Sequence, residues 1–412
     1  MNMLDYLEWR GDLSFTTDPF NEVDALIFSW LSYYPAEKLT LYEDKMRSLT
    51  IRSLYEIHRE QVGEIRDINV KLNINPTDSA VFLLKKAAES PRYADVRILR
   101  FQAIFSQTDN TQFAAFSYEY LPGQAIIAYR GTDGTVTGWR EDFMMCCSDS
   151  IPSQHLAREY LEAEIPAQHE SILLCGHSKG GNIAMHAMLY TDAATRAQVK
   201  KVYNFDGPGF PVPMTSIECY NEVCDRIETI LPESSIIGML LQHEEDYTII
   251  ESEMVSMLQH NAFLWSIRGK TFVRRNHFSE SSKFIDKALH SWLDSLTNAQ
   301  KIDFINVTFD ALEKAGIKDF TDLGPTDIPK LFSLMGSMMT MDSESRKNLF
   351  RVIIAVLQAS GSTVVSGIKD MNILSSMSQE VSDAAGAFTK AVDEGVSKLK
   401  RLFRPLGNGK DT

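Results

Sequence analysis

The stretch SILLCGHSKGGNIAMH, residues 171–186, decides the fold of this chain. Residues 172–175 are all apolar and predict a short buried strand. The next five residues, Gly176 to Gly180, form the pattern G-x-S-x-G. The residues from Asn182 to Tyr190 then predict a helix, because apolar and aromatic side chains recur on one face at helical spacing. The stretch therefore predicts a strand, a sharp turn and a helix in immediate succession.

This order is similar to the nucleophile elbow of the α/β-hydrolases, and Gly181 adds to the likeness. In such a turn, any side chain at Gly176 or Gly180 would strike the neighbouring strand or helix. The turn would raise the Ser178 hydroxyl above the sheet as a nucleophile. It would also leave the backbone N–H of Lys179 at a helix N-terminus, where it can donate to an oxyanion. The alternative interpretation is a plain glycine-rich turn between a strand and a helix.

The composition limits the classes of function. The chain has 412 residues, of which 44% are hydrophobic and 23% charged, as is ordinary for a globular protein of two or three domains. Its formal net charge is −14. A protein without a basic surplus cannot neutralise phosphates over an extended surface, so nucleic acid is not an expected partner.

Cysteine usage and the apolar runs predict a cytoplasmic protein. The number of cysteines is odd, none forms a C-x-x-C pair, and one lies in the strand before the elbow, which favours a reducing compartment. The five are Cys146, Cys147, Cys175, Cys219 and Cys224. The first residues, MNMLDYLEWRGDLSF, do not have the pattern of a signal peptide, and no run of about 18 apolar residues predicts a membrane span.

Strands alternating with helices predict an α/β-hydrolase fold, with a mostly parallel sheet and helices on both faces. The expected strands cover residues 96–105, 113–120, 124–129, 201–205 and 226–231, with 247–252 and 264–273 as a final pair. The first three would form a meander. Helices are expected over 23–33, 79–90 with Ser79 as N-cap, 158–169 and 283–296. We predict an N-terminal helical lead-in or cap over 1–75, the hydrolase core over 76–300, and an all-helical C-terminal region over 301–412.

The C-terminal region shows no strand pattern. Helices are expected over 303–315 and 343–359, and an apolar stripe along 381–403 ends in the basic segment KLKRLFR. One interpretation is a packing face for the core or for a second copy of the chain. The other is a helix in peripheral contact with a membrane surface, since an amphipathic stripe with a basic end suits an anionic interface.

The segment YRGTDGTVTGWREDF, residues 129–143, resembles the oxyanion-loop segment of the class 3 triacylglycerol lipases. That family has an aromatic residue, Arg-Gly-Ser/Thr, a short loop and then Trp-x-x-Asp. The resemblance implies that the backbone N–H of Thr132, with a contribution from its hydroxyl, stabilises the oxyanion together with the Lys179 amide. It also implies that Arg130 and Asp142 are structural partners beneath the loop.

A serine nucleophile needs a base, and the base of an α/β-hydrolase follows the serine in the chain. We expect it to be His260, because QHNAFLWSIRGKTF, residues 259–272, is similar to the histidine loop of the class 3 lipases. His243 and His277 are the alternatives. His186 and His290 lie on predicted helices and are expected to serve packing.

The acid that orients the base remains open between three residues. Glu233 ends a predicted strand near the place where the lipase family carries its Asp, and it is the first choice. Asp206 ends the preceding strand, and Asp246 is a third option. The Lys179 side chain departs from the lipases, which usually have an apolar residue there; we expect it on the surface, with contact to an acidic substrate group as the alternative. No metal cluster, P-loop or dinucleotide fingerprint is present, so no cofactor is expected.

Several segments within about residues 1–300 look like the bacterial Mbeg-like family, a lipase-related domain without an assigned function or substrate. They are DYLEWRGDLSF, PFNEVD, GHSKGGNIA, NFDGPGF, PESSIIGMLL and QHNAFLW. We therefore expect a serine hydrolase that cleaves the carboxylic ester of a small acyl compound or lipid. Thioesterase and acyltransferase activity would use the same site. The alternative is a weak or inactive hydrolase-fold module that binds a partner or membrane through its C-terminal helices. The sequence does not determine the oligomeric state.

Overall fold

The computed structural model describes residues 1–41, 49–71, 75–163, 169–254, 256–280, 282–283, 290, 293, 296–314 and 316–319. The helix expected over 343–359, the amphipathic stripe over 381–403 and most of the helix expected over 283–296 lie outside these residues, and so does the membrane contact inferred from the stripe. Within the described part of the chain, none of the helices has both the length and the apolar composition that a bilayer crossing requires.

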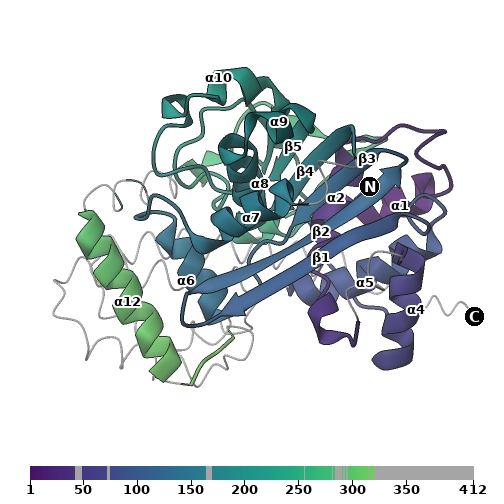
Figure 1. Ribbon diagram of the computed structural model, residues 1–412, viewed down its shortest axis with the longest axis horizontal. Helices are drawn as coiled ribbons and strands as arrows, with labels where there is room; N and C mark the ends of the chain where they lie inside the picture. Colours follow the sequence, from purple (N-terminus) through teal and green to yellow (C-terminus); the bar gives the residue numbers. More distant parts are fainter. Residues whose placement is uncertain are drawn as a thin grey trace, which may run out of the picture.

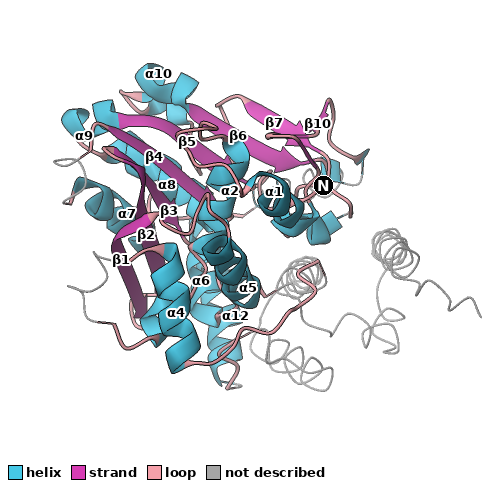
Figure 2. Cartoon of the chain, turned by 90° about the vertical axis from the view of Figure 1, so that its right-hand side faces the viewer, coloured by secondary structure: helices cyan, strands magenta, loops and turns pink. Residues whose placement is uncertain are grey.

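One eight-stranded sheet organises the molecule, and its strands follow one another in chain order (Figure 2). They are β1 (Arg97–Ser106), β2 (Thr111–Leu121), β3 (Gln124–Tyr129), β4 (Ser171–His177), β5 (Val199–Phe205), β6 (Ile227–Pro232), β7 (Tyr247–Ile250) and β10 (Arg274–Arg275). The first three pair antiparallel, the strands from β3 to β7 pair in parallel, and β10 is antiparallel to β7. The predicted meander and the mostly parallel sheet are confirmed.

The final pair of strands differs from the prediction. The strand expected over 264–273 is replaced by the two-residue strands β8 (Ile267–Arg268) and β9 (Thr271–Phe272), which pair with each other, and β10 then joins the main sheet. The cause is Gly269, whose φ of +63° allows a tight turn that a continuous strand cannot contain. The short hairpin leads the chain back to the edge of the sheet.

Helices cover both faces of the sheet (Figures 1 and 2), so the α/β-hydrolase prediction is confirmed at the level of architecture. One face packs against α1 (Met3–Arg10), α2 (Glu22–Leu31), α4 (Ile51–Gln61) and α5 (Pro76–Glu89). The other packs mainly against α7 (Pro152–Glu162) and α8 (Lys179–Tyr190), with α10 (Tyr220–Val223) near the edge. Between β5 and α8 lies the short α9 (Ala193–Gln198). The division into 1–75, 76–300 and 301–412 remains a prediction.

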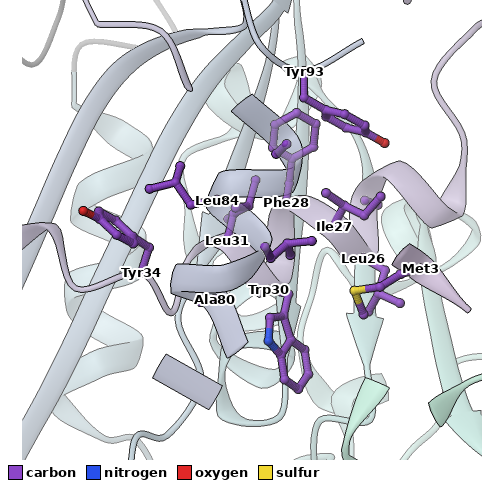
Figure 3. Close-up of a cluster of buried hydrophobic side chains, with 14 of the residues drawn as sticks. Met3, Leu26, Ile27, Phe28, Trp30, Leu31, Tyr34, Ala80, Leu84 and Tyr93 are labelled. Atoms are coloured by element: carbon purple, nitrogen blue, oxygen red, sulfur yellow. The ribbon is translucent and has the colours of Figure 1, made fainter. Parts of the chain in front are cut away.

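Helix α2 is the centre of the first face, and all of its residues are buried. Asn21 begins the helix with a capping box: its side chain accepts from the Val23 and Asp24 amides, and the Asp24 carboxylate accepts from the Asn21 amide. Its apolar side chains then pack with those of α1 and α5 (Figure 3). The burial explains why the residues from Ala25 to Leu31 are apolar except for Ser29.

Two predicted helix starts were wrong, and proline is the reason in both. Helix α5 begins at Pro76 with Asn75 as its cap, so Ser79 lies inside the helix instead of capping it. Helix α7 begins at Pro152, six residues before the expected start at 158. Proline suits the first helical position because its missing N–H would have no partner there.

A buried ion pair joins the N-terminal helices. Arg92 donates to both carboxylate oxygens of Asp24, at 2.8 and 2.6 Å, and neither side chain is exposed. The same carboxylate accepts from the hydroxyl groups of Tyr6 and Tyr93, at 3.2 and 2.5 Å. Arg92 also donates to backbone carbonyls in the loop between α1 and α2. The pair therefore joins α2 to the segment after α5 and to the loop between α1 and α2.

We predict that Arg92→Met lowers the free energy of unfolding by about 3–5 kcal/mol, because Asp24 stays buried without its cation. Guanidinium unfolding of the purified protein measures this change. Arg52→Met is the matched control, since the Arg52 and Asp95 side chains are 48% and 80% exposed and their pair contributes at most about 1 kcal/mol. Equal effects of the two substitutions would contradict the prediction.

Candidate active site

Ser178 lies in a strained turn between β4 and α8. Its φ and ψ are +59° and −133°, and few non-glycine residues adopt a positive φ. A Cβ at Gly176 would lie 2.1 Å from the backbone of Gly180, and one at Gly180 would lie 2.2 Å from the carbonyl oxygen of Tyr129. The crowding predicted for both glycines is thus present. The turn leaves Ser178 at the N-terminus of α8, where the backbone N–H groups have no partner within the helix.

His260 and Asp206 form a hydrogen-bonded pair. Asp206 follows β5 directly, has a φ of +52° and is 1% exposed. Its Oδ2 atom lies 2.7 Å from Nδ1 of His260, which ends a short 3₁₀ turn. Since a carboxylate can only accept, Nδ1 carries the proton, and Nε2 of His260 is left with the lone pair of a base.

His177 connects this pair to the elbow. The ring centroids of His177 and His260 lie 4.4 Å apart, and Nε2 of His177 lies 2.8 Å from the carbonyl oxygen of His260. Nε2 must donate to that carbonyl, so Nδ1 of His177 accepts from the Tyr33 hydroxyl at 3.0 Å. Burial, helped by the nearby His260, holds the pKa of His177 well below its ordinary value. A neutral His177 therefore ties the His260 loop to the residue next to Ser178.

Glu233, the first choice for the acid, does not lie at His260. Its carboxylate lies 3.6 Å from Arg275, because the end of β6 leads toward β7 and β10. The Ser178 amide, by contrast, donates to the carbonyl of Phe205 at the end of β5, immediately before Asp206. The expected contact of Glu233 with the base is thus corrected: the carboxylate that contacts His260 is that of Asp206. Asp246 is exposed.

The other histidines take different places. His243 pairs with Glu245, at 2.8 Å from Nδ1 to Oε1, and His277 is exposed. His186 is buried in α8 and stacks on Tyr190. Of the histidines considered as base, only His260 is brought to the elbow in the described residues.

The loop after β3 lies against the elbow. A Cβ at Gly131 would be 2.4 Å from the carbonyl oxygen of His177, so only glycine permits this contact. The Thr132 hydroxyl donates to Oδ2 of Asp142 on helix α6 (Val136–Met144). Arg130 donates to backbone carbonyls after α2 and to Glu37. Arg130 and Asp142 thus support the loop from two sides.

The Lys179 side chain is buried, which overturns the expectation that it lies on the surface. It is 1% exposed, and its Nζ donates to Glu141 Oε2 at 2.8 Å and to both oxygens of Gln112, at 2.8 and 2.9 Å. Burial alone would lower the pKa of the Lys179 ammonium group. The charges of Glu141 and Asp142 outweigh this effect and raise the pKa above its ordinary value. The ammonium group therefore serves the interior and cannot meet a substrate group.

Helix α6 links the two sides of this network. Its residue Glu141 also accepts from the Gln112 and Ser153 amides, and Asp142 Oδ1 lies 3.8 Å from the Lys179 ammonium. Helix α12 (Asn298–Lys314) lies beside α6 (Figure 1). Arg140 on α6 donates to Asn306 and Asp310 of α12, at 2.8 and 3.0 Å. The helix predicted over 303–315 is thus present, and it braces the helix that supports the Thr132 loop.

Sequence reasoning missed Tyr33, His177, Gln112 and Glu141. Only His177 had a visible signal, since it stands inside G-H-S-K-G directly before the serine. Among the residues that the structure describes, no group of three or more His, Cys, Asp or Glu side chains is arranged to hold a metal ion.

Three comparisons place the chain among known proteins. A family model described as Mbeg1-like matches residues 87–310, more than half of the chain, which confirms the resemblance predicted from sequence. A search of curated proteins finds no match. Among solved structures, the crystal structure of M37 lipase is similar at 16% identity and a TM-score of 0.34, over 52% of this chain and 68% of that chain. At this TM-score the likeness adds nothing to the geometry described above.

We predict that Lys179→Met lowers the free energy of unfolding by about 3–5 kcal/mol, because Glu141 is left buried without a cation. The double variant Lys179→Met, Glu141→Gln should regain a large part of the loss, since removal of both charges leaves no ion unpaired. Guanidinium unfolding of wild type, Lys179→Met, Glu141→Gln and the double variant at one pH measures both effects. A double variant that loses the sum of the two single losses would contradict the pairing.

A pH dependence follows from Asp142. Burial raises its pKa to about 7, against the opposing charge of Lys179. The folded state thus binds a proton that the unfolded chain releases near its ordinary value of about 4, so this group makes stability fall as the pH rises from about 4 to 7. Asp142→Asn cannot ionise, and we expect its stability relative to wild type to rise on the order of 1 kcal/mol or more between about pH 5 and 8. Urea unfolding across this range tests it; a constant difference would refute it.

Proposed function

This chain belongs to the Mbeg1-like family, and we propose that it is a serine hydrolase that cleaves carboxylic esters. The observation that supports the proposal is the His260–Asp206 hydrogen bond of 2.7 Å beside the strained Ser178 turn. A nucleophile at a helix N-terminus, a base next to it and a buried acid behind the base are the three parts that acyl transfer by a serine requires. No other described pair combines a histidine with a carboxylate at the elbow.

In the proposed mechanism, the Ser178 Oγ atom attacks the acyl carbon of the ester. Its proton passes to Nε2 of His260, while the Nδ1–H group stays bonded to Asp206 and the carboxylate stabilises the imidazolium. The tetrahedral intermediate collapses when His260 gives the proton to the departing alkoxide. A water molecule then gives a proton to His260 and attacks the acyl-serine. His260 returns this proton to Ser178 Oγ as the bond to the acyl carbon breaks, which releases the acid and restores Ser178.

The oxyanion would form between two backbone amides. The Lys179 amide begins α8, where the helix dipole adds a partial positive charge. The Thr132 amide lies in the loop that packs on the elbow through Gly131. Donors held in place before the reaction supply a large share of catalysis, because they need no reorganisation as charge develops. The buried Lys179–Glu141 pair fixes the elbow side of this arrangement, and Asp142 fixes the loop side.

We propose a small acyl ester or a lipid as substrate, on the resemblance to the class 3 lipases in the segment 129–143. The alternative, an inactive module that binds a partner or membrane through its C-terminal helices, is not favoured by any contact of the described residues. It would leave the strained Ser178 turn and the buried His260–Asp206 pair without a use. Labelling of the active-site serine with a fluorophosphonate separates the two functions.

The experiment is labelling of the purified protein with a fluorophosphonate, which reacts only with an activated serine. We expect rapid labelling of wild type, none of Ser178→Ala, and a rate at least about 100-fold lower for His260→Ala. Asp206→Asn should also slow the reaction strongly, because the imidazole loses its orienting charge. Glu233→Gln is the matched control, since its carboxylate pairs with Arg275 and should leave the rate unchanged. A folded wild type that resists labelling would favour the binding module.

A further inference from the structure

The carboxylate of Asp206 bonds to a serine hydroxyl as well as to His260. The Ser235 Oγ atom donates to Asp206 Oδ1 at 2.5 Å, while Oδ2 accepts from His260 at 2.7 Å. Ser235 is 2% exposed and Asp206 is 1% exposed, so water does not replace either contact. Each oxygen of the buried carboxylate thus has its own donor.

The loop that carries Ser235 is shaped to fit Asp206. A Cβ at Gly238 would lie 2.3 Å from Asp206 Oδ1 and 2.9 Å from Ser235 Oγ, so only glycine lets the loop approach so closely. The Ser235 amide donates to Pro232 at 2.9 Å, and its carbonyl accepts from the Ser282 hydroxyl. These bonds hold the backbone of Ser235 at the place from which its hydroxyl group reaches Asp206.

The same loop is tied to the residue before His260. The Ser234 amide donates to Gln259 Oε1 at 2.6 Å, and the carbonyl of Gln259 accepts from the Trp265 indole at 2.7 Å. The loop that carries Ser234 and Ser235 and the loop that carries His260 are therefore joined directly. Their relative position does not depend on the His260–Asp206 bond alone.

We propose that Ser235 is a positioning residue for the acid: its hydroxyl holds the Asp206 carboxylate so that Oδ2 faces His260. This inference rests on the proposed serine-hydrolase function. The terminal torsion of an aspartate has broad minima, so a single donor leaves the carboxylate free to rotate. A donor on each oxygen fixes the plane of the group and also favours its charged form. Ser235 would then act on the reaction through Asp206 without touching the substrate.

The test compares fluorophosphonate labelling rates of Ser178 in wild type, Ser235→Ala and Ser234→Ala over a range of pH. Ser234 is the matched control: it is 3% exposed, and its hydroxyl bonds to Ser279 Oγ at 2.8 Å instead of Asp206. We expect Ser235→Ala to be slower by about 10-fold or more, since a bond to a charged group is lost. Its acidic limb should move to higher pH, because loss of one donor leaves more negative charge on the carboxylate that faces the base. Ser234→Ala should follow the wild-type profile.

Ser235→Cys guards against a folding defect, because a thiol fills nearly the same space but is a weak donor. We expect it to fold like wild type and to label slowly. A wild-type labelling rate in Ser235→Cys or Ser235→Ala would overturn the inference. So would an equally slow labelling of Ser234→Ala and Ser235→Ala in which neither variant shifts the acidic limb. If wild type itself is not labelled, the proposed function fails and the inference falls with it. If wild type is labelled and the Ser235 variants react equally fast, only the inference fails.

Discussion

The close contact of the elbow with strand β3 determines where every other group of the site can lie. Backbone atoms of Gly176, Gly180 and Tyr129 approach so nearly that no Cβ fits between them. Ser178 has a positive φ within this crowded turn, and the loop after β3 lies against the elbow through Gly131. The nucleophile and the two candidate oxyanion amides are thus placed by steric exclusion, before any polar interaction is considered.

Polar interactions then stabilise this arrangement from below. The lysine after the nucleophile is buried and neutralised by Glu141, and the neighbouring Asp142 holds the Thr132 hydroxyl. Buried ion pairs add little net stability, but loss of one partner is costly, so these charges stay paired in the folded protein. On the opposite side, Tyr33, His177 and the His260 carbonyl form a second chain of hydrogen bonds. Both networks meet at the residues that flank Ser178.

The sequence predicted the parts whose signal is local. The apolar run before the elbow, the G-x-S-x-G turn and the first three strands depend on neighbours in the chain, and the structure has them at nearly the expected residues. The acid could not be assigned in this way, since Asp206 and Glu233 both end strands, and only the path of the His260 loop decides between them. The burial of Lys179 was also invisible, because its partner Glu141 is 38 residues away and looks like an ordinary surface residue of α6. Non-local pairing, not local propensity, separates the predicted features from the missed ones.

The most direct test of the account is a crystal structure of the protein after reaction with a fluorophosphonate. The phosphonyl group imitates the tetrahedral intermediate of acyl transfer. We predict phosphorus bonded to Ser178 Oγ, its oxygen within hydrogen-bond distance of the Lys179 and Thr132 amides, and His260 still bonded to Asp206. An adduct on another residue, or an oxygen turned away from both amides, would contradict the proposed site.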